Sequence, residues 1–165
     1  MEIIIGLLMA AAIWFVVAQK NKENSPSNST PVFADAQILP DKDAYFEYEI
    51  VGESFYQKEL NRIVGQKTEE SVEIPKQAKL KRDLNNQHDK NAVAVYIDGS
   101  IVGYLNKRDA KDFCRLIKRN RFKDTDSFNV DALIVGGWKR KGSEGSFGVK
   151  LNMPEDINSI VITRY

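Results

Sequence analysis

Hydrophobic and polar residues follow three different patterns along this chain. Residues 3–18 form an unbroken apolar run, residues 21–43 are rich in Asn, Ser, Pro and Lys, and from residue 44 apolar and polar positions alternate in short blocks. Alternation with a period of two predicts strands with one buried face, and apolar residues three and four apart predict amphipathic helices. The pattern therefore predicts a transmembrane anchor at 1–20, a flexible linker at 21–43 and one globular domain at 44–165.

The domain is predicted to be α+β and mainly β, with an antiparallel, barrel-like sheet and two short helices. A turn at Asp98 and Gly99 is expected to join two strands into a hairpin, and the glycines of segment 139–145 allow a second hairpin. The predicted strand regions are 44–50, 72–84, 91–97, 101–105, 128–138, 146–152 and 160–162.

Each of the two predicted helices has a start signal and an apolar stripe. Ser54 and Gln57 match a capping box before the first helix, which should end at Gly65. Asn106 is expected to cap the second helix. The first stripe consists of Leu60, Ile63 and Val64, and the second of Ala110, Phe113, Cys114 and Ile117.

The run at residues 3–18 is the candidate membrane segment. Its 16 residues would span about 24 Å as a helix, less than the ~30 Å hydrocarbon core, so local thinning or snorkelling of Lys20 and Lys22 is required. Glu2 is the only side-chain charge before the run, and both lysines follow it. This arrangement favours an uncleaved, single-pass signal anchor with the domain in the cytoplasm. A cleaved signal peptide is the alternative, and a buried helix of a soluble protein is disfavoured.

Positive charge is concentrated in one part of the chain. The net charge is only +1, from 24 basic and 23 acidic residues, but eight basic and two acidic residues lie between Lys107 and Lys123. A charge run is by default a solvated face. Contact with nucleic-acid phosphates is a second interpretation, extended by the basic segment 139–141, and attraction to anionic lipid is a third.

Several classes of chemistry have no support in the residues. One cysteine, Cys114, and one histidine, His88, exclude an internal disulfide and a Cys/His zinc cluster. The spacing of Asp83, Asp89 and Asp98 matches no metal-binding pattern, and no phosphate-binding G-x-x-x-x-G-K-[ST] motif is present. We therefore expect no metal, no cofactor and no catalytic activity. Cys114 lies on an apolar stripe and is interpreted as a core residue.

A polar loop before the strand at 91–97 is the candidate for ligand recognition. It contains Asn85, Asn86, His88, Asp89 and Lys90, which offer donors, acceptors and a flat ring at the rim of a sheet. Local turn formation by the Asn and Asp side chains is an equally open interpretation. His88 beside Asp89 is not interpreted as a general base, because adjacent residues rarely face each other and no nucleophile accompanies them.

Three separated motifs recur together: V-G-E-S-F-Y-Q at 51–57, N-x-x-D-x-N-A-V-x-V at 86–95 and V-G-Y-L at 102–105. Over roughly residues 46–153 this combination resembles the HIRAN domain, a module of DNA-repair helicases and of free-standing bacterial proteins. The resemblance implies a barrel-like fold that captures nucleic acid, in particular the 3′ end of single-stranded DNA.

The resemblance also implies a set of site residues. Aromatic base contacts fall on Phe55 and His88, a carboxylate contact to the terminal 3′-hydroxyl falls on Asp89, and Asn86, Tyr104 and Lys107 complete the pocket. Two departures weaken the implied binding: Ser54 stands where arginine is found, and His88 replaces a tyrosine. Phe55 and Tyr104 have the alternative interpretation of ordinary core or strand aromatics.

The predicted function is therefore a membrane-tethered, non-catalytic module that binds single-stranded DNA or DNA ends, with RNA as a further possible ligand. The alternative is a protein- or lipid-interaction module at the membrane surface. A nuclease is a third hypothesis, for which no catalytic set is visible.

Overall fold

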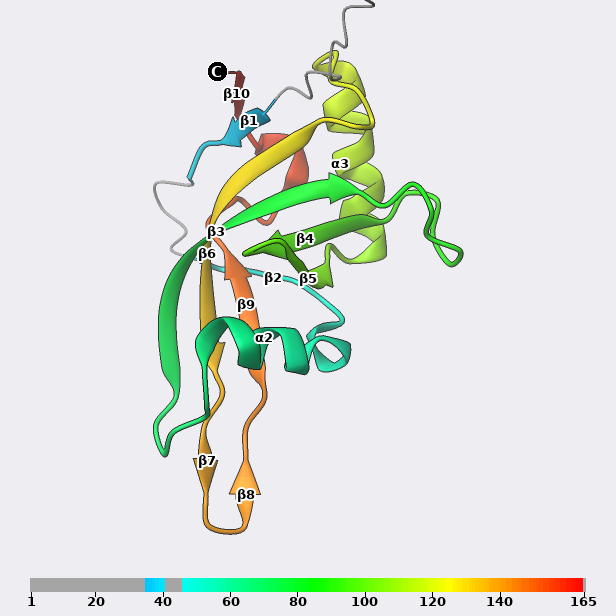
Figure 1. Ribbon diagram of the computed structural model, residues 1–165. Helices are drawn as coiled ribbons and strands as arrows, with labels where there is room; N and C mark the ends of the chain where they lie inside the picture. The colour runs from blue at the N-terminus through cyan, green and yellow to red at the C-terminus, as the bar shows by residue number, and fades with distance from the viewer. Residues whose placement is uncertain (1–34, 41–45, 165) are drawn as a thin grey trace, which may run out of the picture. The chain divides into compact units, whose positions relative to one another are not determined.

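The computed structural model describes residues 35–40 and 46–164 (Figure 1). In chain order the elements are β1 (Asp35–Ile38), β2 (Tyr48–Glu49), the 3-10 helix η1 (Glu53–Phe55), α2 (Gln57–Val64), β3 (Val72–Arg82), β4 (Val93–Ile97), β5 (Ser100–Tyr104), α3 (Lys107–Arg119), β6 (Ser127–Gly136), β7 (Lys139–Arg140), β8 (Ser143–Glu144), β9 (Phe147–Leu151), the 3-10 helix η2 (Ile157–Ser159) and β10 (Ile162–Arg164).

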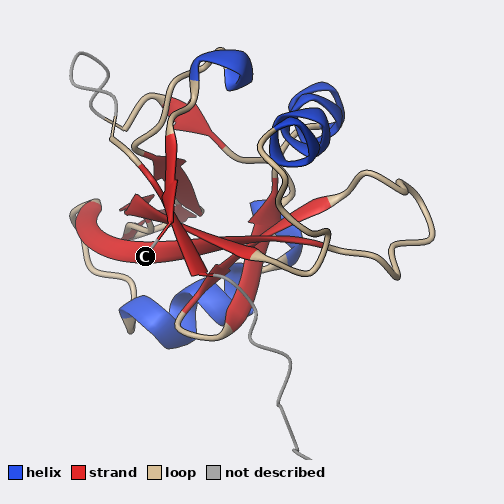
Figure 2. Ribbon diagram, turned by 90° about the horizontal axis from the view of Figure 1, so that it is seen from above, coloured by secondary structure: helices blue, strands red, loops and turns tan. Residues whose placement is uncertain are grey.

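The main sheet curls until strand pairing runs around a ring. Antiparallel pairs join β2 to β9, β9 to β6, β6 to β3, β3 to β4 and β4 to β5. Val51, just after β2, then pairs with Tyr104 in β5 through backbone hydrogen bonds of 2.8 and 2.9 Å. Figure 2 shows the strands curving around the core when viewed from above. The predicted mainly β, antiparallel and barrel-like sheet with two helices is confirmed.

Alternation along the strands separates a core face from an outer face. In β4, Val93, Val95 and Ile97 lie in the core, so Ala94 and Tyr96 lie on the other face. Tyr96 is half-buried there, whereas Ala94 is fully buried. The turn before β5 has positive φ at Asp98 and Gly99, 48° and 78°, as expected for a tight hairpin. The outward row of β4 therefore lies beside the outward residues of β3 and β5.

Helix α3 covers one side of the sheet through the predicted stripe. All four stripe residues are buried, and the ring of Phe113 meets Phe128 of β6 edge-on, with centroids 5.2 Å apart. Asn106 caps the helix as predicted, because its Oδ1 accepts from the Asp109 N–H at 3.0 Å. Cys114 is 4% exposed, which confirms its interpretation as a core residue.

The start of α2 differs from the prediction. Ser54 lies in η1, and no side chain caps α2, so the predicted capping box is wrong. Gln57 instead donates to the Glu53 carbonyl at 3.0 Å and exchanges two 2.9 Å hydrogen bonds with the backbone of Phe147. These long-range bonds satisfy strand groups at the start of β9. The predicted end is confirmed, with Gly65 at φ 101°.

Two strands at the ends of the domain also differ from the sequence pattern. β1, at Asp35–Ile38, lies within the segment predicted as linker and pairs in parallel with β6 and antiparallel with β10. β10 occupies Ile162–Arg164 rather than 160–162. Among residues 35–40 and 46–164, no helix is long and apolar enough to cross a membrane. The apolar run at 3–18 lies outside these residues, and its role stays a prediction.

Candidate nucleic-acid interface

The loop between β3 and β4 is closed by its own backbone. The Asp83 N–H donates to the Ala92 carbonyl at 2.9 Å, and inside this pair Ala92 donates to Asp89 at 3.0 Å and Asn86 to Asp83 at 3.2 Å. The loop is therefore a folded unit that begins and ends at the same edge of the sheet.

Arg82, the last residue of β3, anchors this loop from below. Its side chain is only 7% exposed, and its Nη2 donates to the Lys90 carbonyl at 2.5 Å. Its Nη1 lies 2.7 Å from Asp124, in the segment between α3 and β6. One buried guanidinium thus ties the loop to the opposite connection.

Asn86 and Asp89 form local turns, as one sequence interpretation predicts. Asn86 Oδ1 accepts from the backbone N–H groups of both His88 and Asp89 at 3.0 Å, and Asp89 Oδ1 accepts from Asn91 N–H at 2.8 Å. No hydrogen bond of the described residues uses Asp89 Oδ2. Turn formation and ligand contact are therefore compatible at Asp89, because one carboxylate oxygen is bonded locally and the other can accept from a ligand.

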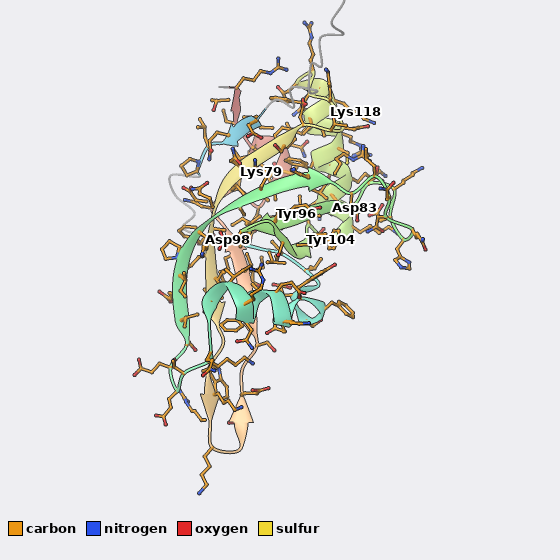
Figure 3. The ribbon with its side chains drawn as sticks, in the orientation of Figure 1. Lys79, Asp83, Tyr96, Asp98, Tyr104 and Lys118 are labelled. Carbon is orange, nitrogen blue, oxygen red and sulfur yellow. The ribbon has the colours of Figure 1, made fainter. Side chains whose placement is uncertain are left out.

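Asp83 brings two of the predicted site residues together. Its Oδ2 accepts from the Tyr104 hydroxyl at 3.2 Å and from Asn86 Nδ2 at 3.1 Å. The Tyr56 ring lies 6.2 Å from that of Tyr104, and Figure 3 shows Asp83, Tyr96 and Tyr104 close to one another. The sequence suggested Asp83 only as an unsupported metal ligand. The sequence did not indicate that Asp83 bonds to Tyr104 and Asn86, because Asp83 falls inside the predicted strand at 72–84.

The tyrosines of this cluster remain protonated well above neutral pH. Burial raises the pKa of Tyr104, and its interactions with Tyr56 and Asp83 raise the pKa further. Burial, with smaller contributions from Asp83 and Tyr56, also raises the pKa of Tyr96. Because Asp83 has an acceptor carboxylate and the phenols keep their protons, the edge presents both kinds of hydrogen-bonding group.

The other predicted site residues make no hydrogen bond to the carboxylate or the tyrosines of this cluster in the described part of the chain. Phe55, on η1, is 85% exposed, so its interpretation as a core aromatic is wrong. His88 is exposed in the loop, where only its backbone N–H is bonded among the described residues. Lys107 is exposed as the first residue of α3. The next residue after Phe55, Tyr56, contacts Tyr104, so η1 reaches the same edge of the sheet.

The outer face of α3 carries positive charge beside the loop. Cys114 Sγ contacts the Asn91 carbonyl at 3.4 Å, which places the helix against the end of the loop. Exposed basic residues of the helix are Lys107, Arg108, Lys111, Arg115, Lys118 and Arg119. Arg115 pairs with Asp112 at 2.7 Å. In the part of the chain that the structure describes, no group of three or more His, Cys, Asp or Glu side chains is placed to bind a metal.

A family model described as the HIRAN domain matches residues 44–131. The chain belongs to the HIRAN domain family. The match begins before β2 and ends within β6, and it includes the loop, η1, β5 and all of α3. HIRAN domains bind single-stranded DNA or DNA ends. No curated protein and no solved structure matches the chain.

Proposed function

We propose that this HIRAN domain binds the 3′ end of single-stranded DNA, without catalysis, at the edge formed by the 83–92 loop, η1 and the end of β5. We call this edge the end site. The observation that carries the proposal is the Asp83 carboxylate, which joins Asn86 of the loop to Tyr104 of β5. Around it lie an exposed aromatic ring, Phe55, and a carboxylate oxygen of Asp89 with no partner among the described residues.

Each group matches one part of a strand end. The open oxygen of Asp89 accepts from a terminal 3′-hydroxyl, and a hydrogen bond to a charged group contributes about 1.5–3 kcal/mol. The rings of Phe55 and His88 offer stacking surfaces, and stacking contributes about 1–3 kcal/mol per base. Lys107 supplies a cation for a phosphate, while the rest of α3 adds a general attraction that salt screens. Polar recognition of an end and sequence-tolerant stacking together favour end binding with little base preference.

The decisive measurement is fluorescence anisotropy of the full-length protein with two single-stranded DNA probes of one sequence, one with a free 3′-hydroxyl and one with a 3′-phosphate. We expect the free hydroxyl to bind more tightly, because a phosphate places negative charge against Asp89. Repeating both titrations over a salt series separates end recognition from general attraction to the basic surface.

The matched variant is Asp89→Asn, which keeps a carbonyl oxygen for the Asn91 N–H bond and removes the charged acceptor. We expect a loss of about tenfold or more for the free-hydroxyl probe. The phosphorylated probe should bind more tightly to the variant than to the unchanged protein, because its repulsion from the Asp89 carboxylate is removed. Phe55→Ala should lower the affinity for both probes. Val161→Ala, at another exposed apolar residue, should change neither affinity. Equal affinity for both probes in the unchanged protein would overturn end recognition.

We also infer that the apolar run at 3–18 anchors the chain in a membrane, with the HIRAN domain in the cytoplasm. The support is the uncharged run followed by Lys20 and Lys22. Resistance to alkaline extraction from membranes, with the domain digestible only from the cytoplasmic side, is the expected result. Release into the alkaline supernatant would contradict an anchor.

A lipid- or protein-interaction module is the second candidate, supported by the exposed basic face of α3. It predicts no binding to either DNA probe at low salt.

A further inference from the structure

A polar cleft of about 600 Å³ lies between α2 and the base of the β7–β8 hairpin. Figure 1 shows this hairpin extending past α2. The cleft is lined by three amide side chains and by three lysines, Lys58, Lys67 and Lys139, with Glu144 as its one acidic lining residue. None of the six predicted site residues lines it. We call it the lysine cleft.

Backbone pairing brings two of these lysines together from distant parts of the chain. Thr68 forms a parallel bridge with Trp138, and the Lys139 N–H donates to the Thr68 carbonyl at 2.6 Å. Lys67 and Lys139 adjoin the two bridged residues, so the bridge sets their side chains at one cleft. Arg140 strengthens the same junction, since its Nε donates to the Glu69 carbonyl at 3.0 Å. The cations are therefore positioned before any ligand arrives.

The positive charge of the lysine cleft is poorly compensated. The Lys67 side chain is only 14% exposed, yet its Nζ lies 3.7 Å from Glu144, whose side chain is 57% exposed. Lys58 and Lys139 make no ion pair with the other described residues. Lys67 Nζ also lies 5.8 Å from the centroid of the Phe147 ring, which partly offsets its charge. Three lysines around one cleft, with Glu144 as its one acidic lining residue, thus favour an anionic ligand.

We propose that the lysine cleft binds backbone phosphates of the strand whose 3′ end lies at the end site. This inference rests on the proposed function. The connection is the start of α2: Tyr56 contacts Tyr104 of the end site, and the next two residues, Gln57 and Lys58, line the cleft. Phe55 is exposed beside this junction, so a strand can pass from the end site over η1 to the lysines.

Phosphate contacts of this kind give affinity without sequence preference. Each single-strand phosphate neutralised by a lysine makes the slope of log affinity against log salt more negative by about 0.7. The cleft should therefore act only on strands long enough to reach it. Binding at the end site alone should not depend on it.

The test uses the full-length protein and two single-stranded DNA probes with free 3′-hydroxyls, about 4 and about 12 nucleotides long. Both lengths lie within the ~4–16 nucleotide site sizes of small barrel domains that bind single strands. The double variant Lys67→Gln/Lys139→Gln removes two cleft cations. The control variant, Lys111→Gln/Lys118→Gln, removes the same charge from the exposed face of α3. Lys139→Gln alone, at an exposed residue, serves as the cleft variant if the partly buried Lys67 is needed for folding.

We expect the cleft variant to bind the long probe about tenfold more weakly at low salt, with a slope of log affinity against log salt that is shallower by about 1.4. For the short probe, we expect the cleft variant and the control variant to have the same affinity. An equal loss in both variants on the long probe would overturn the proposal, as would absence of binding to either probe. If the unchanged protein bound free 3′-hydroxyl and 3′-phosphate probes equally, while the cleft variant still lost affinity for the long probe only, end recognition would be overturned. Phosphate binding by the lysine cleft would still be supported.

Discussion

Replacing Arg82 by methionine tests whether one buried guanidinium stabilises the loop of the end site. Methionine keeps most of the apolar length and removes both bonds, from Nη2 to the Lys90 carbonyl at 2.5 Å and from Nη1 to Asp124 at 2.7 Å. The expected result is a moderate loss of global stability together with a larger loss of order in the loop.

The magnitude follows from three contributions. The bond to the Lys90 carbonyl contributes about 1.5 kcal/mol, the low end for a charged donor. The pair with Asp124 contributes about 1 kcal/mol, because that carboxylate is 39% exposed and water screens it. Arg82 Nε is buried without a partner among the described residues, so its removal returns about 1 kcal/mol. The net destabilisation is about 1.5 kcal/mol, or about 3–6 °C in Tm for a chain of this size.

The assay is urea unfolding of the two proteins, followed by amide hydrogen exchange. Arg119→Met is the control, because Arg119 is exposed and should change the free energy of unfolding by no more than about 0.5 kcal/mol. Exchange at Ala92, whose N–H donates to Asp89, should accelerate in the Arg82 variant only. Equal stability and equal exchange in both variants would refute the assigned role of the guanidinium.

Three further predictions concern the ring of strands and its tyrosines. Gly103→Ala should lower the free energy of unfolding, measured in urea, by about 1–3 kcal/mol, because the new Cβ would lie 2.6 Å from Ile50 Cδ1 and 2.8 Å from the Val51 carbonyl oxygen. Gly148→Ala is the control and should not, because the nearest atom to its Cβ would be 3.5 Å away. Burial raises the pKa of Tyr48 and Tyr104 above the ordinary 10.0, so their contribution to stability is complete below pH 10 and declines above it; phenylalanine at both positions should flatten that decline in unfolding curves. Asp83→Ala should weaken single-strand binding and broaden the NMR signals of Tyr104, and sharp, unshifted signals would contradict the bridging role of the carboxylate.

Local signals predicted much of the fold. The hairpin turn at Asp98 and Gly99 needs two adjacent residues with positive φ, and that requirement is visible in the sequence. The stripe of α3 and its cap at Asn106 likewise depend on residues within a few positions of each other. Features of this range are encoded in short segments, and the sequence can be interpreted without knowing the tertiary structure.

Features that depend on tertiary pairing were not predictable in the same way. β1 has only four residues, and its strand conformation comes from its neighbours β6 and β10. The Gln57 amide matched a capping box locally, but it bonds to the backbone of Phe147, far along the chain. The ring closure at Val51 has no local signal at all.

In the end site, too, the local contacts were predictable from the sequence and the tertiary contacts were not. Turns made by Asn86 and Asp89 involve backbone groups two or three residues away, and they were one of the two predicted interpretations. The contact between Asp83 and Tyr104 joins the end of one strand to another strand, so no spacing in the sequence indicates it. Whether these residues bind DNA stays a prediction for the measurements above.

The pairing of Val51 with Tyr104 also bears on how the chain reaches its native state. The β2 segment has only two strand residues and must join β9 and β5, which are both remote in sequence, whereas β4 and β5 are joined by a turn. Contacts between residues far apart in the sequence cost more loop-closure entropy than local contacts do. We therefore expect the pairing of Val51 with Tyr104, which we call the seam, to form late in folding. Tyr104 lies on the seam, so the end site should be completed only in the last folding step. A kinetic intermediate would then contain most of the sheet and still lack a competent ligand site.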